Sequence, residues 1–178
     1  MADAVAAGFT GLRVATDVTA LVREPAELDA FARYEHQADR LMADRPFSAM
    51  CAFNRTEIGA DALAQLGSMH PLATESVTRF HLHASDRPGC VAALSGELDL
   101  ASGLQLQLAL DRAALTPFDG KLVLDATGLT FVDGARLAAI ADHASGLGAV
   151  LVLRTDQYVP RRLAEMLTVD NVRIEAAS

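Results

Sequence analysis

The segment from Leu122 to Leu137 constrains the fold of this chain more than any other. It opens with the apolar run Leu122 to Leu124, which is typical of a buried strand. A polar turn follows, and Asp133 then stands where a helix can begin, because an aspartate side chain accepts hydrogen bonds from the free N–H groups of a first helical turn. A buried strand that passes through a tight turn into a helix indicates an α/β fold.

The residues around this segment predict the rest of an α/β unit. Two strands are expected first, over Phe80 to His83 and Gly89 to Leu94. Leu104 to Leu110 alternates like a strand, but its lack of β-branched residues favours a helix. A helix, a strand, a helix opened by Pro160 and a last edge strand then follow, over 137–147, 149–153, 160–167 and 172–174. Without that edge strand the predicted order is β-β-α-β-α-β-α, an α/β sandwich.

The first 75 residues predict a smaller β-α-β-α fragment. Strands are expected over Leu12 to Ala15 and, as a buried strand, over Phe47 to Phe53. Helices are expected over Pro25 to Met42 and Gly59 to Leu66. This alternation implies parallel pairing, and a sheet of two strands needs support from elsewhere, which a homodimer would give by covering its open edges. We therefore expect two domains, 1–75 and 76–178, packed closely because no Gly/Ser-rich linker separates them.

The composition argues against several classes of function. A formal net charge of −8 without a basic stripe repels phosphate backbones, so nucleic-acid binding is not expected. No apolar stretch reaches the roughly 18–20 residues that span a bilayer, and no basic segment precedes an apolar core at the N-terminus. Cys51 and Cys90 lack CxxC spacing, which is typical of an intracellular chain. Together these features predict a cytoplasmic protein that does not bind membranes.

Residues 78–175 resemble a STAS domain, the fold of anti-sigma-factor antagonists and of sulfate-transporter tails. The motifs that carry the resemblance are Leu94–Asp99, Leu122–Asp125, Leu129–Asp133, Leu137 and Gly148–Leu153. The resemblance implies a STAS-type α/β sandwich, with a mixed β-sheet and helices, and a bacterial, non-enzymatic regulator that works by partner switching. A kinase-type anti-sigma factor, or another signalling protein, would bind the turn at the start of the second helix of the domain. In the family it can then phosphorylate a Ser or Thr there, which ends the interaction by adding charge at a packed contact.

One position of that loop departs from the family. Ala135 falls on the phosphoacceptor and has no oxygen to phosphorylate, and Arg136 falls on a usual glycine. The resemblance therefore implies partner binding that phosphorylation of this loop does not control. Arg136 is expected to pair with Asp133 or with an acidic partner surface. The residues expected to bind the partner are Asp133, Gly134, Ala135, Arg136 and Leu137, with Asp99 and Asp125 supporting the neighbouring loops.

Residues 8–73 resemble the C-terminal part of the MEDS family, a sensory domain named for methanogens and methylotrophs. The matching residues are Gly11–Val14, Asp17, Tyr34–Glu35, Cys51 and His70–Pro71. The resemblance implies an input module for small organic ligands, and it makes Cys51, His70, Tyr34 and Glu35 the candidate ligand-binding residues.

Each of these candidates also has a structural interpretation. Cys51 and His70 either face each other as a thiol–imidazole pair, or are a buried cysteine and a histidine that caps a helix end. Two ligands alone make a poor zinc site, so no metal or other cofactor is expected. Tyr34 either contacts a ligand together with Glu35 and His36, or packs at the core edge while those two side chains are solvated.

Two functions remain open from the sequence. One is an antagonist that binds an anti-sigma factor through the loop at Asp133. The other is a small-molecule sensor whose C-terminal domain only relays the signal. An enzyme is not expected, because no nucleophile, base and stabiliser converge, and helix capping is favoured over acid–base chemistry for the carboxylates of Asp125 and Asp133.

Overall fold

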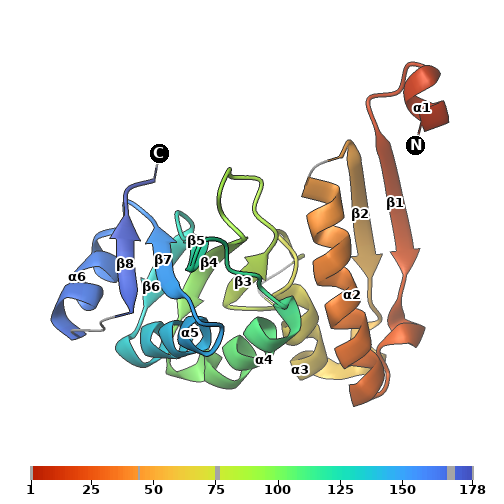
Figure 1. Cartoon of the computed structure of the whole chain (residues 1–178). Coiled ribbons are helices and arrows are strands. Elements are labelled where there is room, and N and C mark those ends of the chain that lie inside the picture. Colours follow the sequence, from red (N-terminus) through yellow and green to blue (C-terminus); the bar gives the residue numbers. More distant parts are fainter. Residues whose placement is uncertain (1, 44, 75–76, 168–170, 178) are drawn as a thin grey trace.

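The computed structural model describes all residues except 1, 44, 75–76, 168–170 and 178. Over this range the chain forms two β-sheets, with helices between them and against the larger sheet (Figure 1). This is the α/β fold that the sequence predicts. The predicted domain boundary, between residues 75 and 76, lies outside the described residues. None of the described helices combines the length and the apolar character needed to cross a membrane.

The N-terminal part contains a two-stranded parallel sheet. Its elements are α1 (Ala2–Ala6), β1 (Leu12–Asp17), a 3-10 turn (Thr19–Leu21), α2 (Pro25–Ala43), β2 (Phe47–Ala52) and α3 (Arg55–Gly67). The strands pair from Leu12 beside Phe47 to Asp17 beside Ala52, which confirms the parallel pairing. The expectation of a buried strand at β2 was wrong, since only Phe47 and Cys51 are half-buried there. The face of the sheet that carries Met50 is open to solvent.

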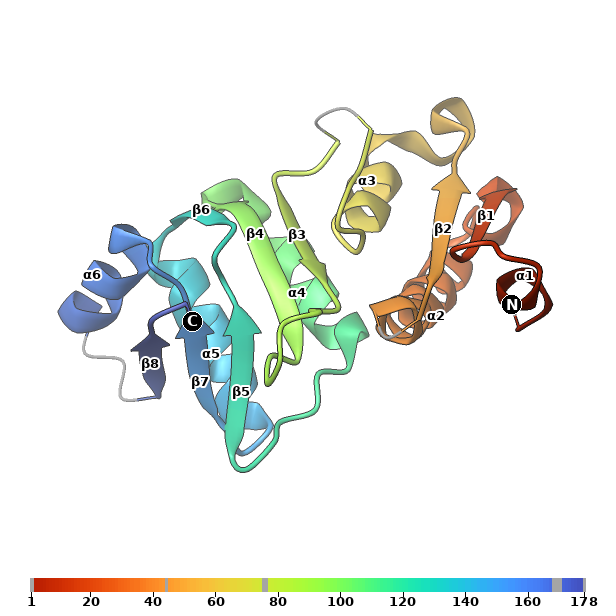
Figure 2. The same cartoon turned by 90° about the horizontal axis from the view of Figure 1, so that it is seen from above.

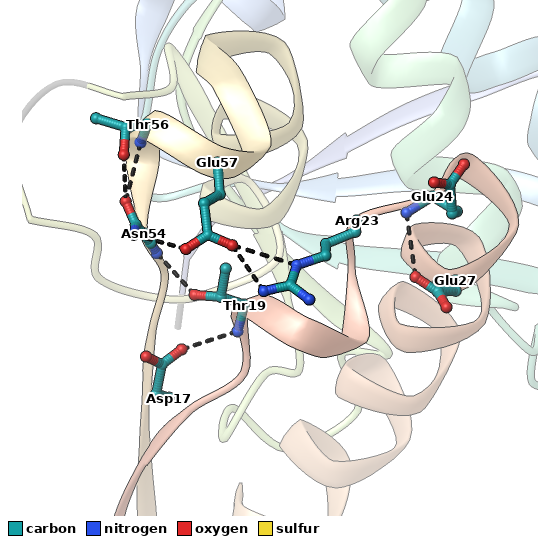
Figure 3. A network of polar contacts seen from close by, with 8 residues as sticks. All are labelled: Asp17, Thr19, Arg23, Glu24, Glu27, Asn54, Thr56 and Glu57. Atoms are coloured by element: carbon teal, nitrogen blue, oxygen red, sulfur yellow. Dashed lines mark hydrogen bonds and ion pairs between the residues drawn. The ribbon is translucent and has the colours of Figure 1, made fainter.

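A network of polar contacts closes the carboxyl end of this small sheet (Figure 3). The backbone N–H of Asn54 donates to the hydroxyl of Thr19 at 2.8 Å, and the Asn54 side chain caps α3. Arg23, which follows the 3-10 turn, donates to Glu57 in the first turn of α3 at 2.8 Å. Because of this cap, α3 begins at Arg55, whereas the sequence predicted that it begins at Gly59. Gly59 lies inside the helix and kinks it, with φ of 79°.

The C-terminal part is built on a sheet with the strand order β3-β4-β5-β7-β8. Its elements are β3 (Phe80–His83), β4 (Ala92–Leu98), a 3-10 turn (Leu100–Ser102), α4 (Gly103–Ala113), β5 (Lys121–Asp125), β6 (Leu129–Val132), α5 (Gly134–Gly146), β7 (Val150–Arg154), α6 (Tyr158–Leu167) and β8 (Val172–Glu175). Strand β3 is antiparallel to β4, and the other pairs are parallel. Helices α4 and α5 lie side by side on one face of the sheet (Figures 1 and 2). Apolar side chains fill the core of this part. The ambiguous segment 104–110 is helical, as predicted.

Strand β6 is an addition to the predicted order. β5 pairs with the start of β4, where Ala92 lies beside Leu124, and β6 pairs with its end, where Leu98 lies beside Val132. The chain therefore turns at 126–128 and then continues along the same edge of β4. What the sequence indicated as one turn before Asp133 is a turn followed by a short strand.

Polar contacts connect the two parts of the chain. Helix α2 lies between the small sheet and the C-terminal part (Figure 2). Arg112 on α4 donates to Asp29 on α2 at 2.8 Å and to Gln65 on α3 at 2.9 Å. Gln105 on α4 donates to the carbonyl of Ala64 on α3. These bonds fix α2 and α3 against α4, so the two parts pack directly on each other, as the absence of a flexible linker predicts.

Candidate functional site

Three of the predicted ligand-binding residues meet between α2, β2 and the end of α3. The Oε2 atom of Glu35 accepts a hydrogen bond from the Cys51 thiol at 3.6 Å and lies 3.1 Å from Nε2 of His70. Nδ1 of His70 lies 2.8 Å from the carbonyl oxygen of Leu66. The donor atoms of the three side chains all lie within 4.8 Å of one another. The predicted thiol–imidazole pair thus forms part of a cluster with a carboxylate.

Local structure explains how this cluster assembles. Glu35 lies one turn after Phe31 on the buried face of α2, so its side chain points toward β2. Cys51 is half-buried on β2. His70 follows the end of α3 in a turn closed by its own N–H, which donates to the carbonyl of Gly67. His70 therefore contacts the end of a helix, as one interpretation predicted, and also lies close to Cys51, as the other predicted.

Tyr34 does not join the cluster. Its side chain is 61% exposed and contacts the Phe31 ring, whereas Glu35 and His36 are buried, Glu35 at 8% exposure. Tyr34 thus lies at the edge of the core, beside Phe31, whereas the expectation that Glu35 and His36 are solvated was wrong. The reason is that α2 is covered on two sides, by β2 and by the C-terminal part, so two polar residues fall on buried faces.

Two histidines in this region have strongly shifted pKa values. Burial by itself would lower the pKa of His70, but hydrogen bonds with Cys51, Glu35 and the Leu66 carbonyl outweigh it and raise the pKa to about 10. These contacts favour the protonated form of the His70 imidazole. For His36, burial and the nearby charge of Arg40 lower the pKa to about 4.

Glu35 and His70 also line an open cavity of about 330 Å³. The N-terminal part contributes further wall residues such as Asp39, while the C-terminal part contributes His83 and Asp86. The Asp39 carboxylate accepts a hydrogen bond from the backbone N–H of Ala84, and burial raises its pKa. The cavity thus lies where the two parts of the chain meet.

The cluster does not have the order of a thiol hydrolase triad. In such a triad the imidazole lies between the thiol and the carboxylate, so that one ring nitrogen faces each of them. Here the thiol and the carboxylate both lie on the Nε2 side of His70, and Nδ1 faces a backbone carbonyl. The geometry suits the binding of a cation or a polar ligand.

A second candidate site is the loop at the start of α5. Asp133 caps this helix, since its Oδ1 accepts the N–H of Arg136 at 2.7 Å, and its own N–H donates to the carbonyl of Leu98. Ala135 is exposed in the first turn, beside Gly134. The Arg136 guanidinium donates to the carbonyl of Leu100 at 3.2 Å, so Arg136 contacts Asp133 through its backbone N–H and not through its side chain. The alternative, a pairing with an acidic partner surface, stays a prediction.

The remaining predicted residues of this loop are placed differently. Leu137 is fully buried and packs in the core. Asp99 caps the 3-10 turn after β4 and pairs with Arg79 at 3.0 Å, close to Asp133 because β4 and β6 end side by side. Asp125 lies before β6 and pairs with Arg87 at 3.2 Å. The structure thus brings Asp99 and Asp133 together and leaves Asp125 apart.

Comparison with known families adds to this geometry. Residues 1–71 match the family model described as MEDS, the MEthanogen/methylotroph, DcmR Sensory domain. The N-terminal part is similar to a sensory domain. The match includes Glu35, Cys51 and His70, and it indicates a sensory or regulatory role. No curated protein matches the chain.

Proposed function

We propose that this chain is a non-enzymatic sensory regulator. Its MEDS-like part binds a small molecule in the cavity beside Glu35 and His70, and its C-terminal part relays the signal by binding another protein. The observation that carries the proposal is that both parts supply the cavity wall, with His83 and Asp86 on the C-terminal side. A ligand in the cavity contacts both parts, so its binding energy favours one arrangement of them over another.

For the second step, we propose a partner surface around the loop at Asp133. The support is the resemblance of residues 78–175 to a STAS domain, together with the exposure of Ala135. Three large apolar side chains, Leu100, Leu104 and Phe131, are also exposed on the segments next to this loop. Exposed apolar side chains of this kind are typical of protein–protein interfaces. A kinase-type anti-sigma factor is the proposed partner, and Ala135 makes the contact insensitive to phosphorylation at that position.

Ligand binding is tested by the thermal stability of the protein against a set of small organic molecules. A molecule that binds in the cavity raises the melting temperature of the wild type. Ala49→Leu narrows the cavity and should abolish that rise. Ala52→Leu is the matched control, because it changes an exposed alanine of the same strand that is not part of the cavity wall. A set without any stabilising molecule counts against the proposed sensor.

Partner binding is tested by capture of kinase-type anti-sigma factors on the immobilised chain. Ala135→Glu places a charge in the loop and should abolish capture. Ala30→Glu introduces the same charge at an exposed position of α2 and should leave capture intact. Equal capture by both variants, or phosphate incorporated in the loop after incubation with ATP, contradicts the proposed partner surface.

We also propose that two copies of the chain pair through β1. All six residues of β1 are exposed, and among the described residues no strand pairs with its outer side. Open sheet edges of this kind pair readily with another strand. Sedimentation equilibrium gives the mass directly, and a monomer throughout the micromolar range argues against pairing.

A further inference from the structure

We propose that Glu35, Cys51 and His70 bind one Zn²⁺ ion, with a fourth coordination position open toward the cavity. The inference rests on the proposed sensory function and names the group through which the sensory part binds its ligand. It starts from the meeting of a carboxylate, a thiol and an imidazole from α2, β2 and the turn after α3.

The distances between the three side chains fit tetrahedral coordination. Zn²⁺ bonds of 2.0–2.3 Å place neighbouring ligand atoms roughly 3.3–3.8 Å apart. Glu35 Oε2 lies 3.1 Å from His70 Nε2 and 3.6 Å from Cys51 Sγ. Because no pair of ligand atoms is farther apart than 4.8 Å, side-chain shifts of about 1 Å are enough to enclose the ion.

The chemistry of the donors selects the metal. A thiolate and an imidazole favour Zn²⁺ over Mg²⁺ or Ca²⁺, which prefer oxygen ligands alone. One thiolate and one carboxylate also neutralise the two charges of the ion, which matters because Glu35 is buried. Three protein ligands leave the fourth position to water or to a ligand, as in sites where zinc remains reactive.

The surroundings of His70 support the same assignment. Nδ1 of His70 is directed at the Leu66 carbonyl, 2.8 Å away, so that Nε2 is the nitrogen that faces Glu35. A histidine that binds a metal usually donates its other N–H to a carbonyl or carboxylate in this way, which fixes the ring and its tautomer. The site is thus oriented by the end of α3.

The cavity determines what occupies the fourth position. Glu35 and His70 lie in its wall, together with the apolar side chains of Met42, Phe47 and Met69. A molecule with one donor atom for zinc and an apolar body would satisfy both the ion and this wall.

The test uses the full chain, reduced and freed of metal with a chelator, and titrated with Zn²⁺ or Co²⁺. One equivalent per chain should bind, and Co²⁺ should give the near-ultraviolet absorption of a cobalt–thiolate bond. Cys51→Ser should remove this absorption and weaken Zn²⁺ binding more than 100-fold, beyond the roughly 10- to 100-fold cost of losing an outer contact. Cys90→Ser is the matched control, since it removes the other thiol and should leave both properties unchanged.

Several results would overturn the site. Cys51 is excluded as a ligand if the wild type binds Co²⁺ without the thiolate absorption. It is also excluded if the absorption disappears in Cys90→Ser and remains in Cys51→Ser. Glu35→Gln provides a second variant with little change in shape, and unchanged affinity in it excludes the carboxylate. No zinc binding, combined with an organic ligand that stabilises the wild type but not Ala49→Leu, rejects the metal site and leaves the sensory function standing. Zinc binding with no response to organic molecules supports the site and counts against the sensing of such molecules.

Discussion

Arg112 connects the C-terminal part to two helices of the N-terminal part, α2 and α3. It lies on α4 and is only 7% exposed. Its Nε donates to Asp29 on α2 at 2.8 Å, and its Nη1 donates to Gln65 on α3 at 2.9 Å. Replacing Arg112 by alanine leaves both partners without this donor. We expect the free energy of unfolding to fall by about 2–3 kcal/mol, somewhat below the usual cost of breaking a buried ion pair, because the side chain of Asp29 is 41% exposed.

A second arginine that pairs with Asp29, Arg33, provides the matched control. Arg33 pairs with Asp29 at 3.2 Å, but its side chain is 61% exposed and lies one turn away on the same helix. Pairs of this kind contribute about 0.3–0.5 kcal/mol, so Arg33→Ala should have a small effect. Urea unfolding of the two variants and the wild type measures the difference. Equal losses in both variants, or a loss below about 1 kcal/mol for Arg112→Ala, would refute the reasoning.

The pH dependence adds an independent check on Arg112. Its hydrogen bond is the main reason why the pKa of Asp29 lies below the usual value of 3.8. A carboxyl group with a lowered pKa stabilises the folded state above the unfolded pKa, and this stabilisation is lost as the pH falls through the folded pKa. The difference between wild type and Arg112→Ala should therefore shrink as the pH falls below 3.8.

Two further predictions concern a glycine and a histidine. Gly96→Ala should lower the free energy of unfolding by several kcal/mol, because φ is 86° and a Cβ would lie 2.3 Å from a backbone oxygen. Gly120→Ala, where φ is 67° and the space around the Cβ is free, should lower it by roughly 1–2 kcal/mol in urea unfolding. The metal-free wild type should lose up to about 3 kcal/mol of its free energy of unfolding between pH 6.5 and pH 4, because His36 binds a proton more readily in the unfolded chain than in the folded chain. His36→Leu should not show this loss. Urea unfolding across this pH range, with chelator present, should therefore give a flatter profile for the variant.

Local patterns were sufficient to predict most of the fold. The alternation of strands and helices gave the parallel pairing of β1 with β2, and the missing β-branched residues identified α4. Strand β6 escaped prediction because its four residues, Leu129–Val132, lie between a turn and a helix cap and appear as part of the turn. Only its pairing with β4, which no local pattern contains, makes it a strand.

The candidate site could be predicted only in part. A pair of Cys51 and His70 was one of two interpretations open from the sequence, but the burial of Glu35 depends on the two-sided packing of α2. The apolar side chains of α2 indicate the face that packs toward β2. The face that packs against the C-terminal part makes its contacts through polar residues such as Asp29, and in the sequence such residues are typical of a solvated surface. The partner surface at Asp133 stays a prediction.

The exposed edge of β1 fixes the geometry of any symmetric pair of chains. A two-fold axis relates identical strands in opposite directions, so two copies of β1 can pair only in antiparallel fashion. The product is a four-stranded sheet in the order β2-β1-β1-β2, antiparallel at its centre and parallel on both flanks. From the small sheet, the cavity takes Phe47, Ser48 and Ala49, all of β2. The two-fold axis would therefore run between the two β1 strands, and one cavity would lie beside each β2 strand. A dimer of this kind holds two separate ligand sites.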